Sequence, residues 1–378
     1  MSFSEIACQD RAIRSLFQAF ASHKTAHTYI FSGPEGVGKF KTASQWARLL
    51  LCPEPVTSQS DNIGLAYESC GTCHSCRLWD GDTHPDFFHV HKELRQFTAD
   101  GKGKAAPVDM PVDVIREFLI AKVGTRPTVS NYKVFVVSEA QKLNTASQNA
   151  LLKVLEEPPV YCCIILLCTR LEKLLPTTKS RAQIIRFGPV NEEYIVEHLR
   201  DFGWDEGKSL YFARLSQGSL GLAVEWARLE ETGADFYGIQ REIVEQLADL
   251  NKAECLLLAE HLQDKAKQIL ASWIGLDTTT SRTDLSRRAL KTVIQMITSV
   301  YEDVMKLPLQ ANVPLIIIHS QQIDLIRNMA EEVSSEAAAD KISDCFTALR
   351  WIEAGVNERL ILERLLLRLA GSDIMQSL

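Results

Sequence analysis

The chain has 378 residues, 46% of them hydrophobic and 24% charged, which is typical of a folded protein and excludes wholesale disorder. This length favours two or three domains, and the formal net charge of -7 excludes a basic protein that coats nucleic acid. The longest apolar runs are far shorter than the ~20 residues that cross a bilayer, and the first residues lack a secretory leader, so we expect a cytoplasmic protein without membrane contact.

In the first half of the chain, short apolar runs alternate with helical patterns. The apolar and β-branched runs predict five strands, at Ala26–Ser32, Asp86–His91, Lys133–Ser138, Cys162–Thr169 and Gln183–Val190. Helical spacing of apolar residues predicts helices between them, at Thr42–Cys52, Val112–Ala121 and Thr145–Glu157. Because apolar strands separated by helices are typical of parallel sheets buried on both faces, we expect an α/β domain with a five-stranded parallel sheet.

After Val190 the strand patterns nearly vanish. Three short helical segments with glycine stops follow, and they predict a small helical lid. From Asp235 onward the pattern is helical, and the leucine-rich segment Asn357–Leu369 predicts a helix packed in a bundle. Composition predicts loops at Phe97–Asp109 and Leu307–Ile318. We therefore expect domains at residues 1–190, 191–234 and 235–378.

A glycine-rich loop, Gly33–Phe40 (GPEGVGKF), follows the first predicted strand and precedes the first predicted helix. Its glycines and Lys39 match the pattern G-x-x-x-x-G-K-[ST], in which backbone amides and a helix N-terminus face a phosphate. The final position holds Phe40 where a hydroxyl would bind Mg²⁺, and Thr42 points to another face of the helix. The pattern predicts a P-loop fold; the alternative is a glycine turn that opens an ordinary helix.

A P-loop ATPase also needs an acidic residue at the end of a neighbouring strand to reach the metal. The candidate strand, Lys133–Ser138, has Ser138 at that position, while the next residue, Glu139, can still orient a water molecule. Two side chains associated with Mg²⁺ are therefore missing together. Their joint absence predicts a nucleotide-binding fold that does not hydrolyse ATP.

Four cysteines form a cluster in the sequence, three of them in a Cys-x2-Cys-x2-Cys pattern: Cys52, Cys70, Cys73 and Cys76. In a long chain without secretory features, such a cluster favours a metal over disulfides, and four thiolates are a common structural zinc site. The seventeen residues between Cys52 and Cys70 predict a surface loop. His74 or His84 as the fourth ligand, an iron–sulfur cluster, and cysteines without a metal are the alternatives.

The order of several motifs resembles bacterial clamp-loader subunits of the AAA+ class. The motifs are HTYIFSGPEGVGK, CGTCHSC, HPDFFHV, VDVIREF, KVFVVSEAQKLNTASQNALLKVLEEPP and LLPTTKSRAQ. The stretch Asn149–Pro159 is the most specific, and the resemblance is strong over Phe3–Val190 and mainly architectural beyond it. Within this family the sequence resembles the delta prime branch of DNA polymerase III most, with gamma/tau as its sister branch.

This resemblance implies roles for individual residues. Those that match the nucleotide site are Gly33, Gly36, Gly38 and Lys39 (Walker A), Glu139 (Walker B) and Thr169 (near sensor 1). Arg181, in the motif Ser180–Ala182, matches an arginine finger that reaches a γ-phosphate in an adjacent subunit; a surface salt bridge is the alternative. Gly221 occupies the sensor 2 place, where ATP-binding sisters have arginine.

The resemblance also implies an architecture and a function. The architecture is an AAA+ nucleotide-binding-like domain with a four-cysteine zinc module at about residues 52–76, a helical lid, and an all-α C-terminal collar for oligomerisation. The function is that of a non-hydrolysing stator with weak or absent ATP binding, within the DNA-directed DNA polymerase (nucleotidyltransferase) holoenzyme. Its implied task is to help load the sliding clamp on primed DNA during DNA replication.

The implied partners are the gamma/tau and delta subunits, the sliding clamp indirectly, and primed DNA within the complex. Lys142 and Lys153 are candidates for modest contacts with the DNA backbone. Two other functions stay open. One is an ATP-hydrolysing motor subunit of the gamma/tau kind, and the other is a non-replicative interaction module that carries zinc on a P-loop scaffold.

Overall fold

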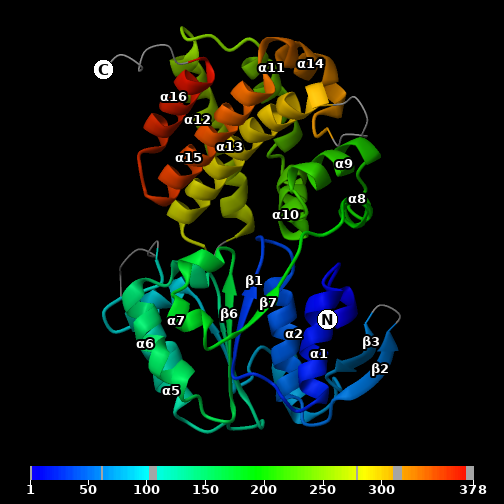
Figure 1. Cartoon of the computed structure of the whole chain (residues 1–378), viewed down its shortest axis with the longest axis vertical. Coiled ribbons are helices and arrows are strands. Elements are labelled where there is room, and N and C mark those ends of the chain that lie inside the picture. Colours follow the sequence, from blue (N-terminus) through cyan, green and yellow to red (C-terminus); the bar gives the residue numbers. More distant parts are fainter. Residues whose placement is uncertain (1, 61–62, 102–108, 278–279, 310–316, 372–378) are drawn as a thin grey trace. The chain divides into compact units, whose positions relative to one another are not determined.

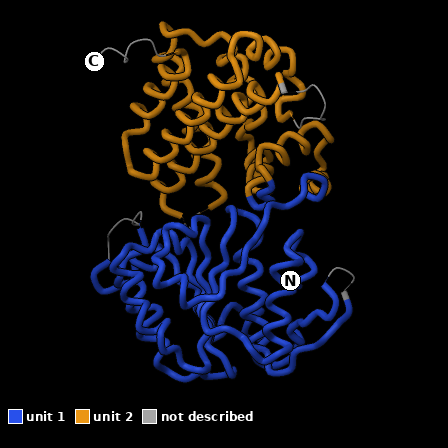
Figure 2. The backbone as a smooth tube through the Cα atoms, in the orientation of Figure 1, with its two compact units in different colours: residues 1–194, 218–221 blue, residues 195–217, 222–378 orange. Residues whose placement is uncertain are grey.

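A computed structural model describes residues 2–60, 63–101, 109–277, 280–309 and 317–371. The chain forms two compact units, residues 1–194 with 218–221 and residues 195–217 with 222–378 (Figure 2). The first unit combines a sheet with helices, and the described part of the second is built from helices (Figure 1). The expected division into three domains, with residues 191–234 as a separate lid, stays a prediction.

Five parallel strands form the main sheet of the first unit, in the order β4-β5-β6-β1-β7. They are β1 (Thr28–Ser32), β4 (Phe87–Val90), β5 (Lys133–Val137), β6 (Cys162–Cys168) and β7 (Gln183–Arg186). The predicted five-stranded parallel sheet is thus confirmed, although β7 ends before the predicted Val190. One detail of the prediction was wrong: β6 lies between β1 and β5, so the strand before Ser138 is not the direct neighbour of the strand before the glycine loop.

The first unit contains helices close to the predicted Thr42–Cys52 and Thr145–Glu157, together with others that were not predicted. They are α1 (Asp10–Ala21), α2 (Lys39–Leu51), α3 (His74–Asp80), α4 (Val112–Ile115), α5 (Ala121–Val123), α6 (Thr145–Glu156) and α7 (Pro176–Lys179). A π-helical stretch, Arg116–Ile120, joins α4 to α5, so the predicted helix over Val112–Ala121 is not a regular α-helix. Helix α6 ends just before Pro158, because a proline disfavours helical backbone at the preceding residue.

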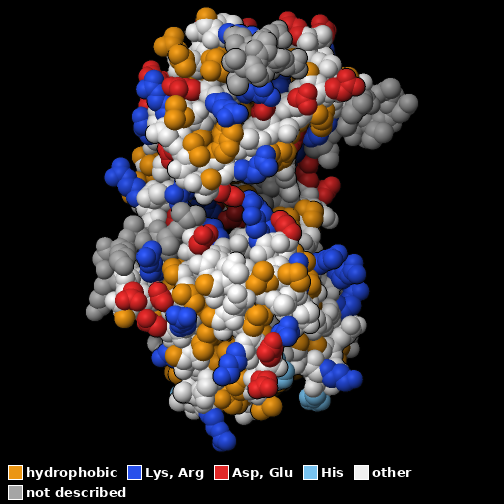
Figure 3. Space-filling view, turned by 60° about the vertical axis from the view of Figure 1, so that its left-hand side comes forward, with side chains coloured by type: hydrophobic (Ala, Val, Ile, Leu, Met, Phe, Trp, Pro, Cys, Tyr) orange, Lys and Arg blue, Asp and Glu red, His pale blue; other side chains and the backbone are white. Residues whose placement is uncertain are grey.

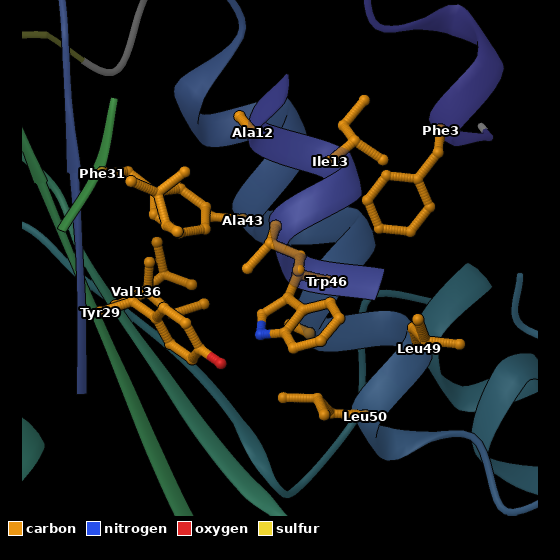
Figure 4. Close-up of a cluster of buried hydrophobic side chains, with 14 of the residues drawn as sticks. Phe3, Ala12, Ile13, Tyr29, Phe31, Ala43, Trp46, Leu49, Leu50 and Val136 are labelled. Atoms are coloured by element: carbon orange, nitrogen blue, oxygen red, sulfur yellow. The ribbon is translucent and has the colours of Figure 1, made fainter. Parts of the chain in front are cut away.

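The core of the first unit lies on both faces of the sheet. Successive strand residues point to opposite faces, so Tyr29 and Phe31 contribute to one cluster and Ile30 to the other. On the first face the two aromatic rings of β1 pack with Trp46 of α2 (Figure 4). On the second face Leu151 of α6 is completely buried. This double burial explains why the central strands β1, β5 and β6 consist mainly of apolar residues.

A small antiparallel hairpin lies between Cys52 and Cys70. Its strands are β2 (Val56–Ser60) and β3 (Gly64–Glu68). The predicted surface loop at this place was therefore wrong. The hairpin is held from outside its own sequence: Tyr67 packs edge-on against Phe17 of α1 at 5.6 Å between ring centroids, and the Glu68 carboxylate accepts a hydrogen bond from the backbone N–H of Phe3 at 2.9 Å.

Helices follow one another after Val190, as predicted. They are α8 (Glu192–Arg200), α9 (Glu206–Leu215), α10 (Leu220–Glu231), α11 (Phe236–Ala248), α12 (Cys255–Leu276), α13 (Arg282–Lys306), α14 (Ile323–Glu332), α15 (Ser335–Glu353) and α16 (Glu358–Leu369). Helix α13 packs against α12 and α15, and α16 packs against the same two helices. The Asn357 side chain caps α16 by accepting hydrogen bonds from its first backbone N–H groups. The predicted C-terminal bundle is confirmed.

The loops predicted at Phe97–Asp109 and Leu307–Ile318 fall largely outside the described residues. Among the helices that the structure does describe, none is both long enough and apolar enough to cross a membrane.

Candidate functional site

The glycine loop connects the carboxyl end of β1 to α2. Gly38 has a φ of 97°, a left-handed conformation that side chains disfavour, and α2 begins at the next residue. The Lys39 side chain turns back into the loop, where its ammonium group donates hydrogen bonds to the carbonyl oxygens of Gly33, at 2.8 Å, and of Pro34. Burial lowers the pKa of Lys39. The loop thus accepts hydrogen bonds from its own lysine.

Phe40 and Ser138, the two positions where the sequence lacks a Mg²⁺ ligand, both contact His89 of β4. The Phe40 ring lies against the ring of His89, with 4.8 Å between their centroids. Nε2 of His89 is in turn 2.8 Å from the hydroxyl of Ser138. The Thr42 hydroxyl donates to the carbonyl oxygen of Gly38 at 2.9 Å, so it is bound within its own helix. His89 therefore connects the two positions that lack the expected Mg²⁺-binding side chains.

Burial lowers the pKa of His89 to about 4, so its ring is neutral near pH 7. The ring of His91 lies 4.8 Å away, centroid to centroid, and its proximity also disfavours a charge on His89. A neutral imidazole beside a serine hydroxyl and a phenyl ring carries no charge that would substitute for an aspartate. This cluster is formed by side chains from α2, β4 and the end of β5.

Glu139 is held by two lysines. Its backbone has a φ of 51°, and its carboxylate lies 3.6 Å from the Nζ of Lys92 and forms a second ion pair with Lys142. Thr169 lies at the end of β6, where its backbone N–H donates to Gln141 at 3.2 Å. The glycine loop, Ser138, Glu139 and Thr169 all follow the carboxyl ends of parallel strands, so the structure gathers these predicted residues at one edge of the sheet.

Gly221 is bonded to the glycine loop itself. Its backbone N–H donates to the carbonyl oxygen of Gly36 at 2.8 Å. A Cβ added at residue 221 would lie 2.8 Å from the Cα of Gly36, closer than such contacts occur. The sensor 2 place thus presents backbone to the loop, with no side chain between them.

Arg181 lies away from the glycine loop of its own chain. Gln183, two residues on, pairs with Tyr29 near the start of β1, whereas the glycine loop follows the end of that strand. The Arg181 guanidinium bonds Glu156 at 2.6 Å and the carbonyl oxygen of Thr177 at 3.0 Å, and about a third of its side chain is exposed. The structure therefore places Arg181 at the opposite edge of the sheet.

The four cysteines of the predicted metal site converge. The sulfur of Cys52 lies 3.6 Å from that of Cys70 and 4.0 Å from that of Cys73, and the sulfurs of Cys70 and Cys76 lie 4.0 Å apart. All four sulfurs lie within 4.8 Å of one another. Tetrahedral zinc with Zn–S bonds of about 2.3 Å requires S–S distances of about 3.8 Å, so the arrangement fits such a site.

Hydrogen bonds within this cluster favour thiolates. The backbone N–H of Cys70 points at the sulfur of Cys52, that of Cys73 at Cys70, and that of Cys76 at Cys73, at 3.3–3.4 Å. Backbone hydrogen bonds from Thr72 and Cys73 lower the pKa of Cys70 to about 6. By contrast, burial raises the pKa of Cys52 to about 12, which a bound cation would counteract.

Neither alternative histidine joins the cluster. His74 is exposed on α3. The ring of His84 is buried and already uses both nitrogens, Nε2 with the Ser75 hydroxyl at 2.8 Å and Nδ1 with the backbone N–H of Asp86 at 3.2 Å. Among the described residues, the set with converging ligand atoms contains Cys52 as its fourth member.

The sequence did not single out His89 or Lys92. A signal was present, because Phe87 and His89 alternate with the apolar residues Phe88 and Val90 and so share one face of β4. The contact between His89 and Ser138 also depends on the pairing of β4 with β5, in which His89 lies beside Val136. No pattern within either strand predicts that pairing.

Comparisons with known proteins identify the family of the chain. A family model described as "DNA polymerase III, delta subunit" matches residues 8–191, and another, "DNA polymerase III, delta subunit, C terminal", matches residues 284–371. The DNA polymerase III subunit delta' of Escherichia coli K12 is 32% identical over 209 residues, which cover 55% of each chain. That of Pseudomonas aeruginosa is 35% identical over 156 residues, 41% of each chain.

Gamma/tau subunits match as well. The one of Mycobacterium tuberculosis H37Rv is 36% identical over 180 residues, 48% of this chain and 27% of the relative. The matched region covers 55% of the length of the Escherichia coli relative and a smaller share of the other two. A solved gamma subunit-related protein of Thermotoga maritima has 16% identity and a TM-score of 0.42, with coverage of 96% of this chain and 98% of that one. The two family models span most of the chain, which belongs to the DNA polymerase III clamp-loader family.

Proposed function

We propose that this chain is a clamp-loader subunit of the delta prime kind, which does not hydrolyse ATP and supplies Arg181 to the ATP site of an adjacent subunit. In this role it helps place the sliding clamp on primed DNA. The observation that carries the proposal is the contact of His89 with both Phe40 and Ser138, at the two positions where a P-loop ATPase holds its Mg²⁺.

The chemistry of these side chains argues against hydrolysis. Mg²⁺ requires oxygen ligands in near-octahedral geometry and is usually bound through carboxylates and phosphates. Phe40 offers no oxygen, and the Ser138 hydroxyl is uncharged and engaged with His89. Lys39, which would neutralise phosphate charge, is bonded to carbonyls of its own loop. ATP binding is therefore weak or absent, and catalysis by this loop is not expected.

The position of Arg181 supports a role in trans. It lies at the edge of the sheet opposite to its own glycine loop, so it serves that loop poorly. Its ion pair with Glu156 is partly exposed, and such pairs contribute only about 0–1 kcal/mol. A neighbour's phosphate, which accepts two parallel hydrogen bonds from a guanidinium, can therefore displace Glu156.

The four cysteines form, by this proposal, a structural zinc site. Four thiolates fill a tetrahedral coordination sphere and leave no position for a reactive water molecule. The metal would tie the end of α2 to the start of α3, since Cys52 follows α2 and Cys73 precedes α3. Its contribution is to folding and not to catalysis.

The proposed partners are the gamma/tau and delta subunits, the sliding clamp, and primed DNA. Direct DNA contact is expected to be modest. On the face that Figure 3 shows, basic and acidic side chains are interspersed, and of the two candidate lysines, Lys142 is paired with Glu139. Contacts with DNA would then be made jointly with other subunits.

Gamma/tau relatives match the chain at similar identity, so sequence similarity does not separate a stator from a motor. The distinguishing experiment is reconstitution with the gamma/tau and delta subunits, followed by assays of clamp loading and ATPase activity. We expect that the isolated chain does not hydrolyse MgATP. We also expect that the complex needs this chain for clamp loading. Turnover by the isolated chain that depends on Lys39 would favour the motor, and failure to co-purify with these subunits would favour an unrelated interaction module.

A further inference from the structure

A buried chain of hydrogen bonds begins beside the four cysteines. The carbonyl oxygen of Leu51, the residue before Cys52, accepts hydrogen bonds from two hydroxyls, those of Ser75 and Ser130, each at 2.8 Å. Ser75 itself stands between Cys73 and Cys76. The same two hydroxyls lie 3.3 Å apart. A residue far along the chain, Ser130, is therefore bonded directly to the backbone that positions the metal site.

His84 extends this chain inward. Because the Ser75 hydroxyl gives its proton to Leu51, the His84 Nε2, 2.8 Å away, must be the donor to Ser75. Its Nδ1 is then the acceptor for the backbone N–H of Asp86, at 3.2 Å. These partners select one neutral tautomer, and burial lowers the pKa of His84, in agreement with a neutral ring.

Asp86 completes the chain. It is completely buried, and its carboxylate accepts three backbone hydrogen bonds, from Thr128 at 2.6 Å, Val129 at 2.8 Å and Ser130 at 2.9 Å. Burial alone would raise the pKa of Asp86, but the three N–H donors outweigh it and the pKa is lowered. A buried carboxylate is thus used to fix the backbone of a segment that carries a partly exposed side chain, Val129.

We propose that His84 and Asp86 are positioning residues that couple the metal site to the segment Thr128–Ser130, so that metal binding orders this segment. The inference rests on the proposed metal site and goes beyond it. The sequence offered His84 only as an alternative ligand. In the structure His84 bonds Ser75, which lies between two of the cysteines, and Asp86 bonds the backbone of Ser130. Through them the metal would determine how a surface segment more than fifty residues away from Cys76 is presented.

Coupling of this kind is reciprocal. If the bound metal favours the ordered segment by some factor, then metal affinity is lower by the same factor when the segment is disordered. Residues that orient metal ligands from behind typically change metal affinity about 10–100-fold when they are replaced. We expect a value near the low end, about tenfold, because the coupling passes through Leu51 and Ser75 and not through a direct bond to a sulfur.

The test uses the full chain and two readouts. The first is zinc affinity, measured by competition with a chromophoric chelator, in His84→Ala, Asp86→Asn and Ser130→Ala. The second is hydrogen exchange of the amides of Thr128–Ser130 with and without zinc. We expect affinity to fall about tenfold in each variant and exchange at these amides to accelerate when zinc is removed. Ser130→Ala, the mildest change, keeps the test valid if Asp86→Asn does not fold.

The matched control is Leu151→Ala, which destabilises the same unit from the core on the second face of the sheet. It should leave zinc affinity and the exchange of Thr128–Ser130 unchanged. Affinities of the three variants equal to that of the wild type, with exchange that does not respond to zinc, would overturn the coupling alone. Absence of zinc binding by the wild-type chain would overturn both the coupling and the metal site, and so the two failures are distinguishable.

Discussion

The backbone N–H of Gly221 donates to the carbonyl oxygen of Gly36 at 2.8 Å, and a side chain at residue 221 would collide with the Cα of Gly36. The two glycines thus let two backbones meet at the loop where a nucleotide phosphate would bind. In ATP-binding members of the family, by the resemblance described above, an arginine stands at this place.

Replacement of Gly221 by alanine is expected to destabilise the first unit. Gly221 lies in the first turn of α10, where alanine would otherwise be favoured by about 1 kcal/mol. The collision is with backbone atoms, which cannot move aside as a flexible side chain can, so we expect a net loss of about 1–3 kcal/mol. Hydrogen exchange of the β1 amides measures this loss.

The matched control is Gly275→Ala in α12, where an added Cβ meets nothing within 4 Å. There alanine should stabilise the helix by about 0.5–1 kcal/mol. If Gly221→Ala also stabilised the protein, the close contact with Gly36 would be disproved.

Replacement of Glu156 tests whether its ion pair with Arg181 affects the ATPase rate of the assembled loader. Glu156→Ala removes the ion pair at a cost of no more than about 1 kcal/mol, since the pair is partly exposed, and leaves the hydrogen bond of Arg181 to Thr177 in place. We expect the ATPase rate of the reconstituted loader to stay the same or to rise by up to about fivefold, the equivalent of that energy. A strong decrease would show that Glu156 holds Arg181 in its working position.

Acid should destabilise the first unit partly through His89. Burial lowers the pKa of this ring to about 4, whereas the unfolded chain takes up a proton near pH 6.5. Between these values the unfolded state binds more protons, so stability falls as the pH falls, by at most about 1.4 kcal/mol per pH unit. Above about pH 7 the His89 ring is neutral in both the folded and the unfolded state, so it no longer makes stability depend on pH.

His89→Gln should weaken this pH dependence. We expect the free energy of unfolding of the variant to change less between about pH 6.5 and pH 4 than that of the wild type. His74→Gln, which replaces an exposed histidine of the same unit that lies outside this cluster, is the control. Equal slopes for His89→Gln and the wild type would mean that folding does not lower the pKa of His89.

The main sheet could be predicted from sequence because its central strands, β1, β5 and β6, are buried on both faces and therefore form nearly unbroken apolar runs. The β2–β3 hairpin could not, because β2 is mostly polar and the stabilising partners of the hairpin, Phe17 and Phe3, lie in other elements. The same distinction holds at the site. The glycine loop and the cysteine spacing are local patterns, whereas the contact of His89 with Ser138 and that of Gly221 with Gly36 arise only from tertiary folding.

The protein purified without chelator should contain about one zinc ion per chain, as four thiolates imply. Cys73→Ser and Cys52→Ser should each lose most of the metal and destabilise the first unit. Cys8→Ser, which changes an exposed cysteine outside the cluster, is the control and should retain it. Metal analysis that found full zinc occupancy in Cys52→Ser would indicate a histidine as the fourth ligand.

The central claim is that this chain acts on a neighbour's ATP and not on its own. It is tested most directly by the DNA- and clamp-stimulated ATPase rate of the reconstituted loader, compared between Lys39→Ala and Arg181→Ala, with incorporation checked by gel filtration. We predict that Lys39→Ala leaves the rate unchanged and that Arg181→Ala lowers it at least about twofold, since a trans arginine accelerates its own site by far more. A rate that falls with Lys39→Ala, or that is unaffected by Arg181→Ala in a complete complex, would contradict the account.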